Sequence, residues 1–326
     1  MPSARSCRPG GAIAAFLAAL ALAGCAARPP HPEAFAFAAV GDLPYRASEE
    51  APFDEMIARL SAEKLAFVVH VGDFIASSGS GCADAVYADR KRRLDASVHP
   101  LVLTPGDNDW ADYRRAGNGR KDPLERLAAV RERFFADDFS LGRTRMPLAV
   151  QRACVERGPA ACACPGLPEN RLWTKSGVVF VTVHAIGSND NKGFDAANDA
   201  EQRCRALANA AWLDGAFRLA AGAGQRGLAI VTHVNPWSEK SGVHDALVAR
   251  VAAGAKALAK PVLFVHGDTH FYQSDHPFRD IDGRTVGNLR RVEVFGSPIV
   301  GWVRVTVDPG DPALFSVSPQ LPPGAP

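Results

Sequence analysis

The chain has 326 residues, of which 47% are hydrophobic and 22% charged, a composition typical of a globular protein with a sizeable core. Residues 1–24 contain two of the 37 basic residues and no acid, so the remainder has 35 basic and 35 acidic residues. This balance argues against general nucleic-acid binding, which depends on neutralising phosphates. The one basic cluster, at 90–93, stands among aspartates and is interpreted as a solvated helix face.

The first thirty residues predict export. Two arginines precede an apolar run at 11–23, which is too short to cross a bilayer comfortably as a permanent helix, and Leu-Ala-Gly then precedes Cys25. This arrangement resembles the bacterial lipobox, in which the cysteine is acylated and becomes the mature N-terminus. The resemblance implies a signal peptide at 1–24, a linker at 25–33 and a membrane-anchored lipoprotein on the periplasmic or extracellular face of the bacterial cell envelope. A plain signal peptide or an uncleaved anchor is the alternative.

Six near-continuous apolar runs predict strands that are buried on both faces. They lie at 35–40, 65–71, 101–104, 178–186, 228–232 and 262–265. Between them are segments with helical patterns, at 52–62, 83–97, 122–135, 195–221 and 244–258. Strands and helices that alternate in this way argue for α/β layering.

The C-terminal part follows a different pattern. Three short strands are expected there with no helix between them, at 291–295, 302–307 and 314–317. The Gly/Pro turns that separate them favour an antiparallel addition to a sheet. One domain is expected at 34–317, with an irregular insertion at 137–175 and a loose Pro-rich tail at 318–326.

Export makes disulfides possible. Five cysteines follow Cys25, so at least one thiol is free or pairs with another molecule. Three of them fall in the insertion: Cys154, Cys162 and Cys164. A disulfide-pinned loop is favoured there over a zinc knuckle, because no histidine lies within that segment.

Carboxylates and imidazoles follow five of the predicted strands, and four of these strand ends also carry a glycine, which permits a sharp turn and a close approach. Ligands of open α/β folds bind outside the carboxyl ends of the strands. The five segments are Gly41-Asp42-Leu43-Pro44-Tyr45, His70-Val71-Gly72-Asp73, Pro105-Gly106-Asp107-Asn108-Asp109-Trp110, Thr232-His233-Val234-Asn235-Pro236 and His266-Gly267-Asp268-Thr269-His270. Clustered carboxylates repel one another unless a cation neutralises them, so a metal site is the simplest inference.

These segments resemble the ordered motifs of the calcineurin-like metallophosphoesterases: Asp-x-His, Gly-Asp, Gly-Asn-His-Asp/Glu, a lone His and Gly-His-x-His. The similarity runs from about Phe35 to His270. It implies an α/β fold of the two-sheet α/β/β/α sandwich type, with two divalent metal ions at the strand ends. It also implies hydrolysis of phosphate mono- or diesters by a hydroxide that bridges the two metals.

The resemblance assigns roles to individual residues. Asp42 and His270 would bind the first metal, His233 would bind the second, and Asp73 would bridge both. Two further ligands differ from the family pattern, since Asp107 replaces an asparagine and Asp268 replaces a histidine. The metals themselves stay open among Mn, Fe, Mg, Ca and Zn, although an oxygen-rich ligand set favours Mn²⁺, Mg²⁺ or Ca²⁺ over zinc.

Other departures bear on catalysis. Asn108 replaces a histidine that contacts phosphate, and it cannot act as a general acid, a role worth ~10²- to 10⁴-fold in rate. Pro44 replaces a histidine ligand, and Tyr45 either fills the gap, as a phenolate does in purple acid phosphatases, or packs against its loop. His70 and His266 either orient ligands or are satisfied core histidines.

Two functions remain open at this point. The first is a phosphoesterase that acts on a phosphate-ester substrate. The alternative is a catalytically impaired metal- or phosphate-binding lipoprotein of the same fold. A purely structural envelope protein is disfavoured by the retained Asp73, His233 and His270.

Overall fold

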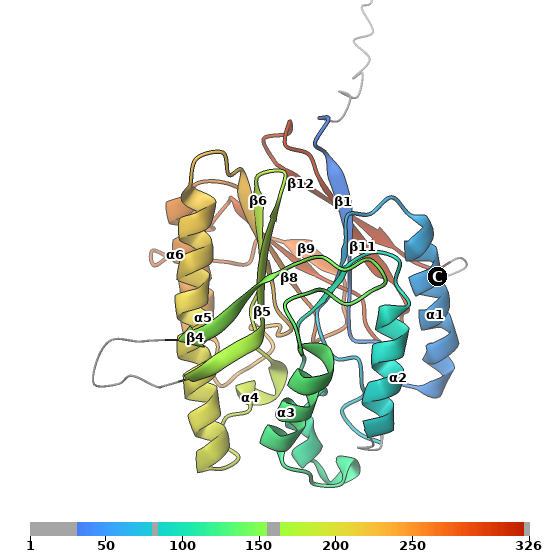
Figure 1. The fold of residues 1–326 in the computed structure, drawn as a ribbon. Helices are drawn as coiled ribbons and strands as arrows, with labels where there is room; N and C mark the ends of the chain where they lie inside the picture. Colours follow the sequence, from blue (N-terminus) through green and yellow to red (C-terminus); the bar gives the residue numbers. More distant parts are fainter. Residues whose placement is uncertain (1–30, 80–83, 155–163, 323–326) are drawn as a thin grey trace, which may run out of the picture. The chain divides into compact units, whose positions relative to one another are not determined.

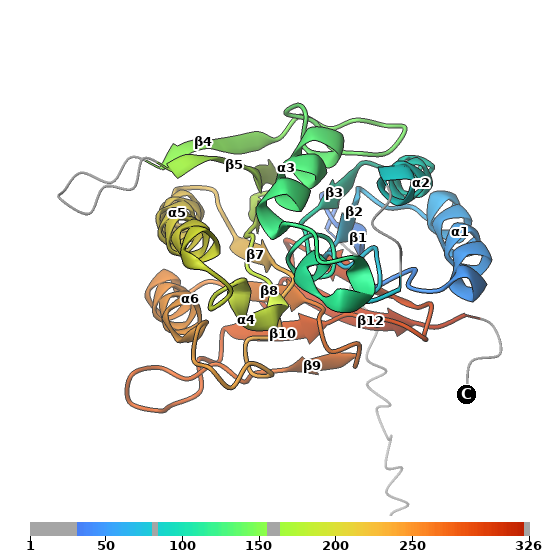
Figure 2. The same ribbon diagram turned by 90° about the horizontal axis from the view of Figure 1, so that it is seen from below.

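The computed structural model describes residues 31–79, 84–154 and 164–322. The predicted signal peptide, Cys25 and Cys162 lie outside these ranges, as do the side chains of Cys154 and Cys164. Cys204 is disulfide-bonded. Within the described ranges the fold is mixed α/β, with two β-sheets at its centre and helices on their outer faces (Figures 1 and 2).

The first sheet has five strands in the order β12-β11-β1-β2-β3. Its parallel part consists of β1 (Phe35–Val40), β2 (Val68–His70) and β3 (Leu101–Leu103). The strands β11 (Trp302–Val307) and β12 (Phe315–Gln320) extend it in antiparallel fashion from β1. The carboxyl ends of β1, β2 and β3 therefore lie at one edge of this sheet.

The second sheet has seven strands in the order β4-β5-β6-β7-β8-β10-β9. Its parallel centre is formed by β6 (Val178–Thr182), β7 (Gly227–Val231), β8 (Val262–His266) and β10 (Leu289–Glu293). Antiparallel strands complete both sides, namely β4 (Ala149–Cys154), β5 (Cys164–Lys175) and β9 (Gln273–Asp275).

The core between the sheets is rich in aromatic side chains. Phe37 of the first sheet stacks on Phe67 with ring centroids 5.0 Å apart, and Trp173 stacks on Phe180 of the second sheet at 5.2 Å. Phe67 meets Phe180 edge-on at 5.1 Å, which joins the two pairs. Such ring contacts add about 0.5–1.5 kcal/mol each beyond the apolar area they bury.

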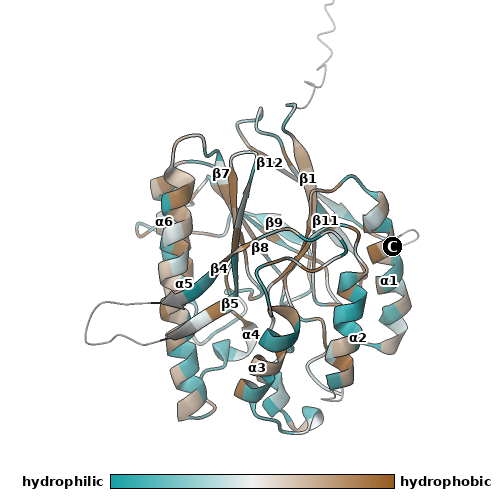
Figure 3. Ribbon diagram, viewed as in Figure 1, coloured by the Kyte–Doolittle hydropathy of each residue, from teal (hydrophilic) through white to brown (hydrophobic). Residues whose placement is uncertain are grey.

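The strands are buried on both faces, as their apolar runs predict. In β7, Ala229 and Val231 face the other sheet, whereas Leu228 and Ile230 pack against helices. The helices α1 (Ala47–Ala62), α2 (Asp84–Asp95) and α3 (Pro123–Phe134) cover the first sheet, and α5 (Ala196–Ala221) and α6 (Asp245–Leu258) cover the second. Figure 3 shows the hydrophilic residues that the helices carry, most clearly on α2.

Side chains at the helix starts explain where two of the helices begin. The Asp122 carboxylate accepts a hydrogen bond from the backbone N–H of Leu124, with a proline at the first position of α3. Asp195 caps α5 in the same way through two backbone N–H groups. None of the helices in the described part of the chain is both long and apolar enough to span a bilayer.

The segment 137–175, predicted to be an irregular insertion, is not irregular throughout. It contains the antiparallel pair β4 and β5, which lengthens the second sheet. The sequence hides this pair because β5 contains prolines and the buried polar residues Glu169 and Asn170, which interrupt the apolar alternation. Both side chains are satisfied by internal hydrogen bonds, so burial is tolerated.

Two predictions for the C-terminal part also need correction. The strand expected at 291–295 is β10, which lies antiparallel to β9, as expected, but parallel to β8. The parallel pairing was not expected, because no helix in the connection from β8 signals a crossover. The tail is ordered as strand as far as Gln320. Pro319 fits there because β12 is an edge strand, where a missing N–H can face away from the ladder.

Candidate metal centre

The residues predicted to bind metal follow the carboxyl ends of five parallel strands. Asp42, Asp73 and Asp107 come after β1, β2 and β3 of the first sheet, and His233 and Asp268 come after β7 and β8 of the second. Hydrogen bonds tie these loops together across the two sheets. The backbone N–H of Asp268, for example, donates to the Asp42 carboxylate at 3.2 Å. The candidate metal centre is defined here as Asp42, Asp73, Asp107, His233, Asp268 and His270.

Five of these six side chains form two groups that could hold a metal ion. One is Asp42, Asp73 and His233, and the other is Asp107, His233 and Asp268, with the ligand atoms in each group within 4.8 Å of one another. His233 Nε2 is shared by both groups. It lies 3.0 Å from Asp107 Oδ1, 3.4 Å from Asp73 Oδ1 and 3.8 Å from Asp268 Oδ1.

His270 joins the centre from its more exposed side. Its Nε2 lies 3.7 Å from Asp42 Oδ1, and its side chain is 27% exposed, whereas that of Asp42 is fully buried. Both histidines are oriented alike: His233 donates Nδ1–H to the Val71 carbonyl, and His270 donates Nδ1–H to the Ser297 carbonyl, each at 2.9 Å. Fixing Nδ1 in this way aims the Nε2 atom of each ring at the carboxylates, as metal-binding histidines require.

The backbone at the centre is held in an uncommon conformation. Asp42, Asp73, Asp268 and His270 all have positive φ, between 54° and 81°. Such values cost of order 1–3 kcal/mol for each non-glycine residue, and they gather at functional sites where the surrounding structure enforces them. The two sheets thus impose the inward direction of these side chains at the expense of local stability.

Glycines permit the close approach of the loops. A Cβ atom on Gly106 would lie 1.9 Å from Asp73 Oδ1, and one on Gly267 would lie 2.2 Å from Asp42 Oδ2. Real Cβ contacts are never this short, so any other residue at either position would displace a carboxylate of the centre.

Burial raises the pKa of three of the four carboxyl groups. The pKa of Asp42 rises to about 8 and that of Asp268 to about 6, in both cases mainly because burial disfavours the charged form. Burial also raises the pKa of Asp73 well above its usual value, and the neighbouring carboxylates of Asp107, Asp109 and Asp42 add to the effect. The protein alone does not stabilise these groups as anions.

His233 is the basic side chain that faces these carboxylates. Burial alone would lower its pKa, but Asp73, Asp107 and Asp42 together raise that pKa well above its usual value. Asp107 is the counterpart: burial would raise its pKa, but the hydrogen bond and charge of His233 lower it. In the part of the chain that the structure describes, no arginine or lysine pairs with Asp42, Asp73, Asp107 or Asp268.

Tyr45 points its hydroxyl group into the centre. The Tyr45 Oη atom lies 2.9 Å from Asp73 Oδ2, 3.3 Å from His270 Nε2 and 3.5 Å from Asp42 Oδ1. Asn108, the predicted substrate-contacting residue, lies beside it: its side-chain amide donates to Tyr45 Oη at 3.1 Å, and its backbone N–H donates to Asp73 Oδ1 at 3.0 Å.

His70 and His266 lie behind the ligands. His70 Nδ1 accepts from the backbone N–H of Gly72, and His266 Nδ1–H donates to the Gly267 carbonyl. Burial lowers the pKa of each to about 3, so both are neutral. They contact the backbone of the ligand-bearing loops, and in the described residues neither ring forms a hydrogen bond with a ligand carboxylate.

Two residues that contact the metal centre or its loops, Asp109 and Ser188, were not assigned a role from the sequence. The Asp109 carboxylate accepts from the backbone N–H groups of Asp73, Phe74 and Gly106, which locks the second and third loops together. The Ser188 hydroxyl lies 2.7 Å from Asp107 Oδ2. Asp109 is the acidic end of the third motif, which could have indicated it, whereas Ser188 belongs to a polar segment, 187–191, that matches none of the motifs.

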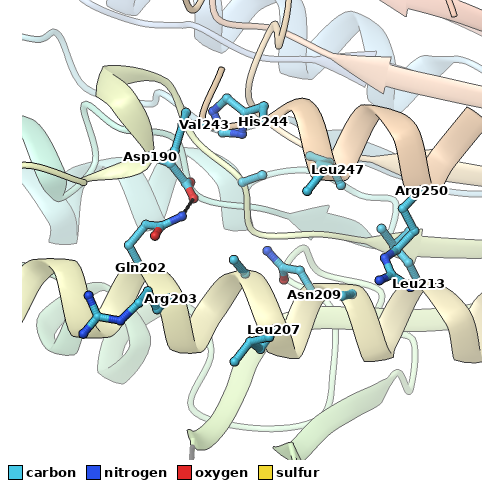
Figure 4. A pocket seen from close by; sticks show the side chains of 14 residues that line it. Asp190, Gln202, Arg203, Leu207, Asn209, Leu213, Val243, His244, Leu247 and Arg250 are labelled. Atoms are coloured by element: carbon cyan, nitrogen blue, oxygen red, sulfur yellow. Dashed lines mark hydrogen bonds between the residues drawn. The ribbon is translucent and has the colours of Figure 1, made fainter. Parts of the chain in front are cut away.

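The largely apolar cavity between α5 and α6 is separate from this centre. It has a volume of about 390 Å³, and Leu207, Leu213 and Leu247 are among its lining residues (Figure 4). The segment 185–190 contributes Ala185 and Asp190 to the cavity, and its Ser188 contacts Asp107 of the metal centre. None of the predicted metal ligands lines it.

Comparison with known proteins does not place the chain in a family. No protein-family model matches it, and no curated protein is similar to it in sequence.

Proposed function

We propose that this protein is a metal-dependent phosphoesterase, built as the two-sheet α/β/β/α sandwich of the calcineurin-like metallophosphoesterases. One observation carries the proposal: four carboxylates and two inward-facing imidazoles converge at the strand ends, and in the described residues no arginine or lysine balances them. Buried carboxylates are normally paired or coordinate metals. A site with so much uncompensated acid is best explained by bound cations.

The donor set fits two divalent cations. Asp42, Asp73 and His270 would hold the first, with the Tyr45 oxygen as a further donor on the same side. Asp107, His233 and Asp268 would hold the second. Asp73 would serve both, since its Oδ1 atom lies 3.4 Å from His233 Nε2 in the second group. Six of these seven donors are carboxylate or imidazole, and oxygen predominates, which suits Mn²⁺ or Mg²⁺ better than zinc.

Bound cations would supply Lewis-acid polarisation of the phosphoryl group and would acidify a water molecule for attack. The chain's own residues would orient the metal ligands and the phosphoryl group. His233 and His270 are held by backbone carbonyls, and Asn108 presents its amide N–H donors beside Asp73. Asn108 can donate a hydrogen bond to a phosphoryl oxygen but cannot protonate a leaving group.

This arrangement predicts a preference for esters with good leaving groups. The purified full-length protein, supplied with Mn²⁺, is expected to hydrolyse an aryl phosphate far better than an alkyl phosphate, and Asp73→Asn is expected to abolish the hydrolysis. Asp214→Asn, a change in an exposed ion pair on α5, is the matched control and should retain activity. Equal, metal-independent background in all three proteins would refute the proposal.

A second candidate is a metal- or phosphate-binding protein of the same fold without turnover. The position of Tyr45 favours it, because its hydroxyl group lies within 3.5 Å of Asp42, Asp73 and His270. Asn108, which donates to that hydroxyl group, supplies no general acid. Stoichiometric binding of Mn²⁺ with no hydrolysis of any aryl phosphate would select this function over the first.

We also propose that the protein is anchored to the bacterial envelope through a lipid on Cys25, on the basis of the preceding apolar run and Leu-Ala-Gly. Cys25→Ser should release the protein from the membrane fraction. Continued association of this variant with membranes would contradict acylation at that residue.

A further inference from the structure

Two arginines in the loop after β3 lie close to the metal centre without contacting its six residues. Arg114 and Arg115 lie at the end of the short 3-10 helix Ala111–Arg114. The Arg115 Nη2 atom lies 2.8 Å from Asp112 Oδ2 and 3.0 Å from the Ser188 Oγ atom. Since Ser188 Oγ lies 2.7 Å from Asp107 Oδ2, one hydroxyl group separates the Arg115 guanidinium from a candidate metal ligand.

The Ser188 hydroxyl belongs to an unusual turn, α4 (Gly187–Asp190). Four successive residues, from Ser188 to Asn191, have φ between 52° and 64°, the left-handed region that L-residues otherwise enter singly. The turn lies against the second metal group, because a Cβ atom on Gly187 would be 2.7 Å from Asp268 Oδ1 and 2.9 Å from Asp107 Oδ1.

Arginines hold this turn in place from both sides. Buried Arg205 pairs with Asp190 at 2.5 Å, and Arg114 donates to the Ser188 carbonyl and to Asn191 Oδ1, each at 3.2 Å. A strained turn that the surrounding structure fixes so firmly is typical of a functional site. Its effect here is to set the position of the Ser188 hydroxyl, and hence of the guanidinium that donates to it.

The Arg115 guanidinium is held by a buried partner on one side and exposed to solvent on the other. Asp112, its partner, is fully buried, whereas the Arg115 side chain is 48% exposed. Of its two contacts, only that between Nη2 and Ser188 Oγ is a hydrogen bond, whereas Asp112 is an ion-pair partner. A guanidinium carries five N–H donors in a planar fork, so donors remain for a ligand. That fork matches the oxygens of a phosphoryl group, which arginine binds through two parallel hydrogen bonds.

We propose that Arg115 binds the phosphoryl group of the substrate, and that the substrate is a phosphate monoester. The inference rests on the proposed phosphoesterase function and names the substrate class of that site. A monoester offers three non-esterified oxygens, enough for two cations and a guanidinium, whereas a diester offers two. Asn108, which is neutral, replaces a histidine that contacts phosphate in the resembling family. Arg115 would supply a charged contact to the phosphate in its place.

Phosphate binding tests the role of Arg115 without relying on turnover. Full-length wild-type protein, Arg115→Ala and Arg115→Lys are loaded with Mn²⁺ and titrated with inorganic phosphate by calorimetry. Arg115→Ala is expected to raise the Kd about 10- to 100-fold, the typical worth of a hydrogen bond to a charged group. Arg115→Lys should fall in between, because it keeps the charge and loses the fork. The exposed Arg143→Ala is the matched control and should bind as the wild type does.

The outcomes separate this inference from the proposed function. If Mn²⁺ content is unchanged and Arg115→Ala binds phosphate as tightly as the wild type, Arg115 is not the phosphate ligand. A wild-type protein that takes up no Mn²⁺ overturns the metal centre itself. If Arg115→Ala does not fold, the test rests on Arg115→Lys. A Kd for phosphate in that variant equal to the wild-type Kd would show that the guanidinium does not bind phosphate through two parallel hydrogen bonds.

A second experiment tests the substrate class. Arg115→Ala should reduce kcat/KM for an aryl monoester more than for the matching diester, and an equal loss refutes the monoester assignment.

Discussion

Two buried ionic regions of this protein handle carboxylates in opposite ways. In the metal centre, Asp42 and Asp268 surround a single buried imidazole, and their pKa values are raised to about 8 and about 6. In a second region, here called the arginine network (Arg131, Glu169, His184, Asp190 and Arg205), the pKa values of Glu169 and Asp190 are lowered instead.

The difference lies in the partners rather than in the burial. Burial is the largest influence in both regions and always acts to raise a carboxyl pKa. In the arginine network it is outweighed, because Arg131 grips Glu169 through two hydrogen bonds of 2.6 and 3.0 Å, and Arg205 pairs with Asp190. Glu169 and Asp190 thus have guanidinium partners within the fold. The carboxylates of the metal centre have none among the described residues, so an external cation is their expected partner.

The largest expected effect comes from removing a partner in the arginine network. Arg205→Ala leaves Asp190 buried without its counter-ion, and should lower the free energy of unfolding by about 3–5 kcal/mol. Urea denaturation measures the loss. Arg250→Ala, which breaks an exposed pair with Asp214, is the control and should cost about 1 kcal/mol or less. Similar losses in the two variants would show that Asp190 does not depend on Arg205.

A pH titration of stability should separate the two regions by sign. The folded-state pKa of Asp42 lies above its unfolded value, so the metal-free native state binds the extra proton and loses stability as the pH rises from about 4 to about 8, by at most ~1.4 kcal/mol per pH unit. The folded-state pKa of Glu169 is depressed, so its contribution is present above its unfolded pKa and is lost on acidification.

Substitutions separate the contributions of Asp42 and Glu169 to the change of stability with pH. In metal-free protein, Asp42→Asn should flatten the decline between pH 4 and pH 8, whereas Glu169→Gln should weaken the loss of stability at acid pH. Guanidinium denaturation at a series of pH values gives both curves. An Asp42→Asn curve that follows the wild type throughout would mean that Asp42 is compensated by the protein alone.

A smaller effect is expected at Tyr45. Tyr45→Phe removes only the hydroxyl that faces Asp73, Asp42 and His270. If that oxygen is a donor to the first metal, the variant should bind one Mn²⁺ equivalent about 10-fold less tightly, the typical worth of a contact to a charged group, and leave the other unchanged. Its free energy of unfolding without metal should shift by about 1 kcal/mol or less, the net worth of one hydrogen bond. Two unchanged affinities would remove Tyr45 from the ligand set.

Much of the candidate metal centre could be predicted from the sequence, because its residues follow strands with strong apolar signals. Asp42, Asp73 and His233 each lie within three residues of a strand end, and parallel strands of one sheet bring their ends together. The structure brings together all six predicted ligands, with His270 at the margin.

The arginine network could not be predicted in the same way. Glu169 lies in β5, whose prolines and buried polar residues hide the strand, and its partner Arg131 is 38 residues away on α3. The network nevertheless reaches the metal centre, because the indole N–H of Trp110, in the third ligand-bearing loop, donates to His184 Nε2. Contacts between distant, individually unremarkable polar residues leave no local pattern to read.

The contrast between the two regions is tested most directly by titrating the metal-free, full-length protein with Mn²⁺ by calorimetry, with elemental analysis of the loaded product. Two equivalents per chain are expected for the wild type and for the control Asp214→Asn, with a raised melting temperature, since a ligand that binds only the native state stabilises it. Asp73→Asn should lose at least one equivalent. Binding by Asp73→Asn that matches the wild type, or no binding by either protein, would contradict a metal centre at these strand ends.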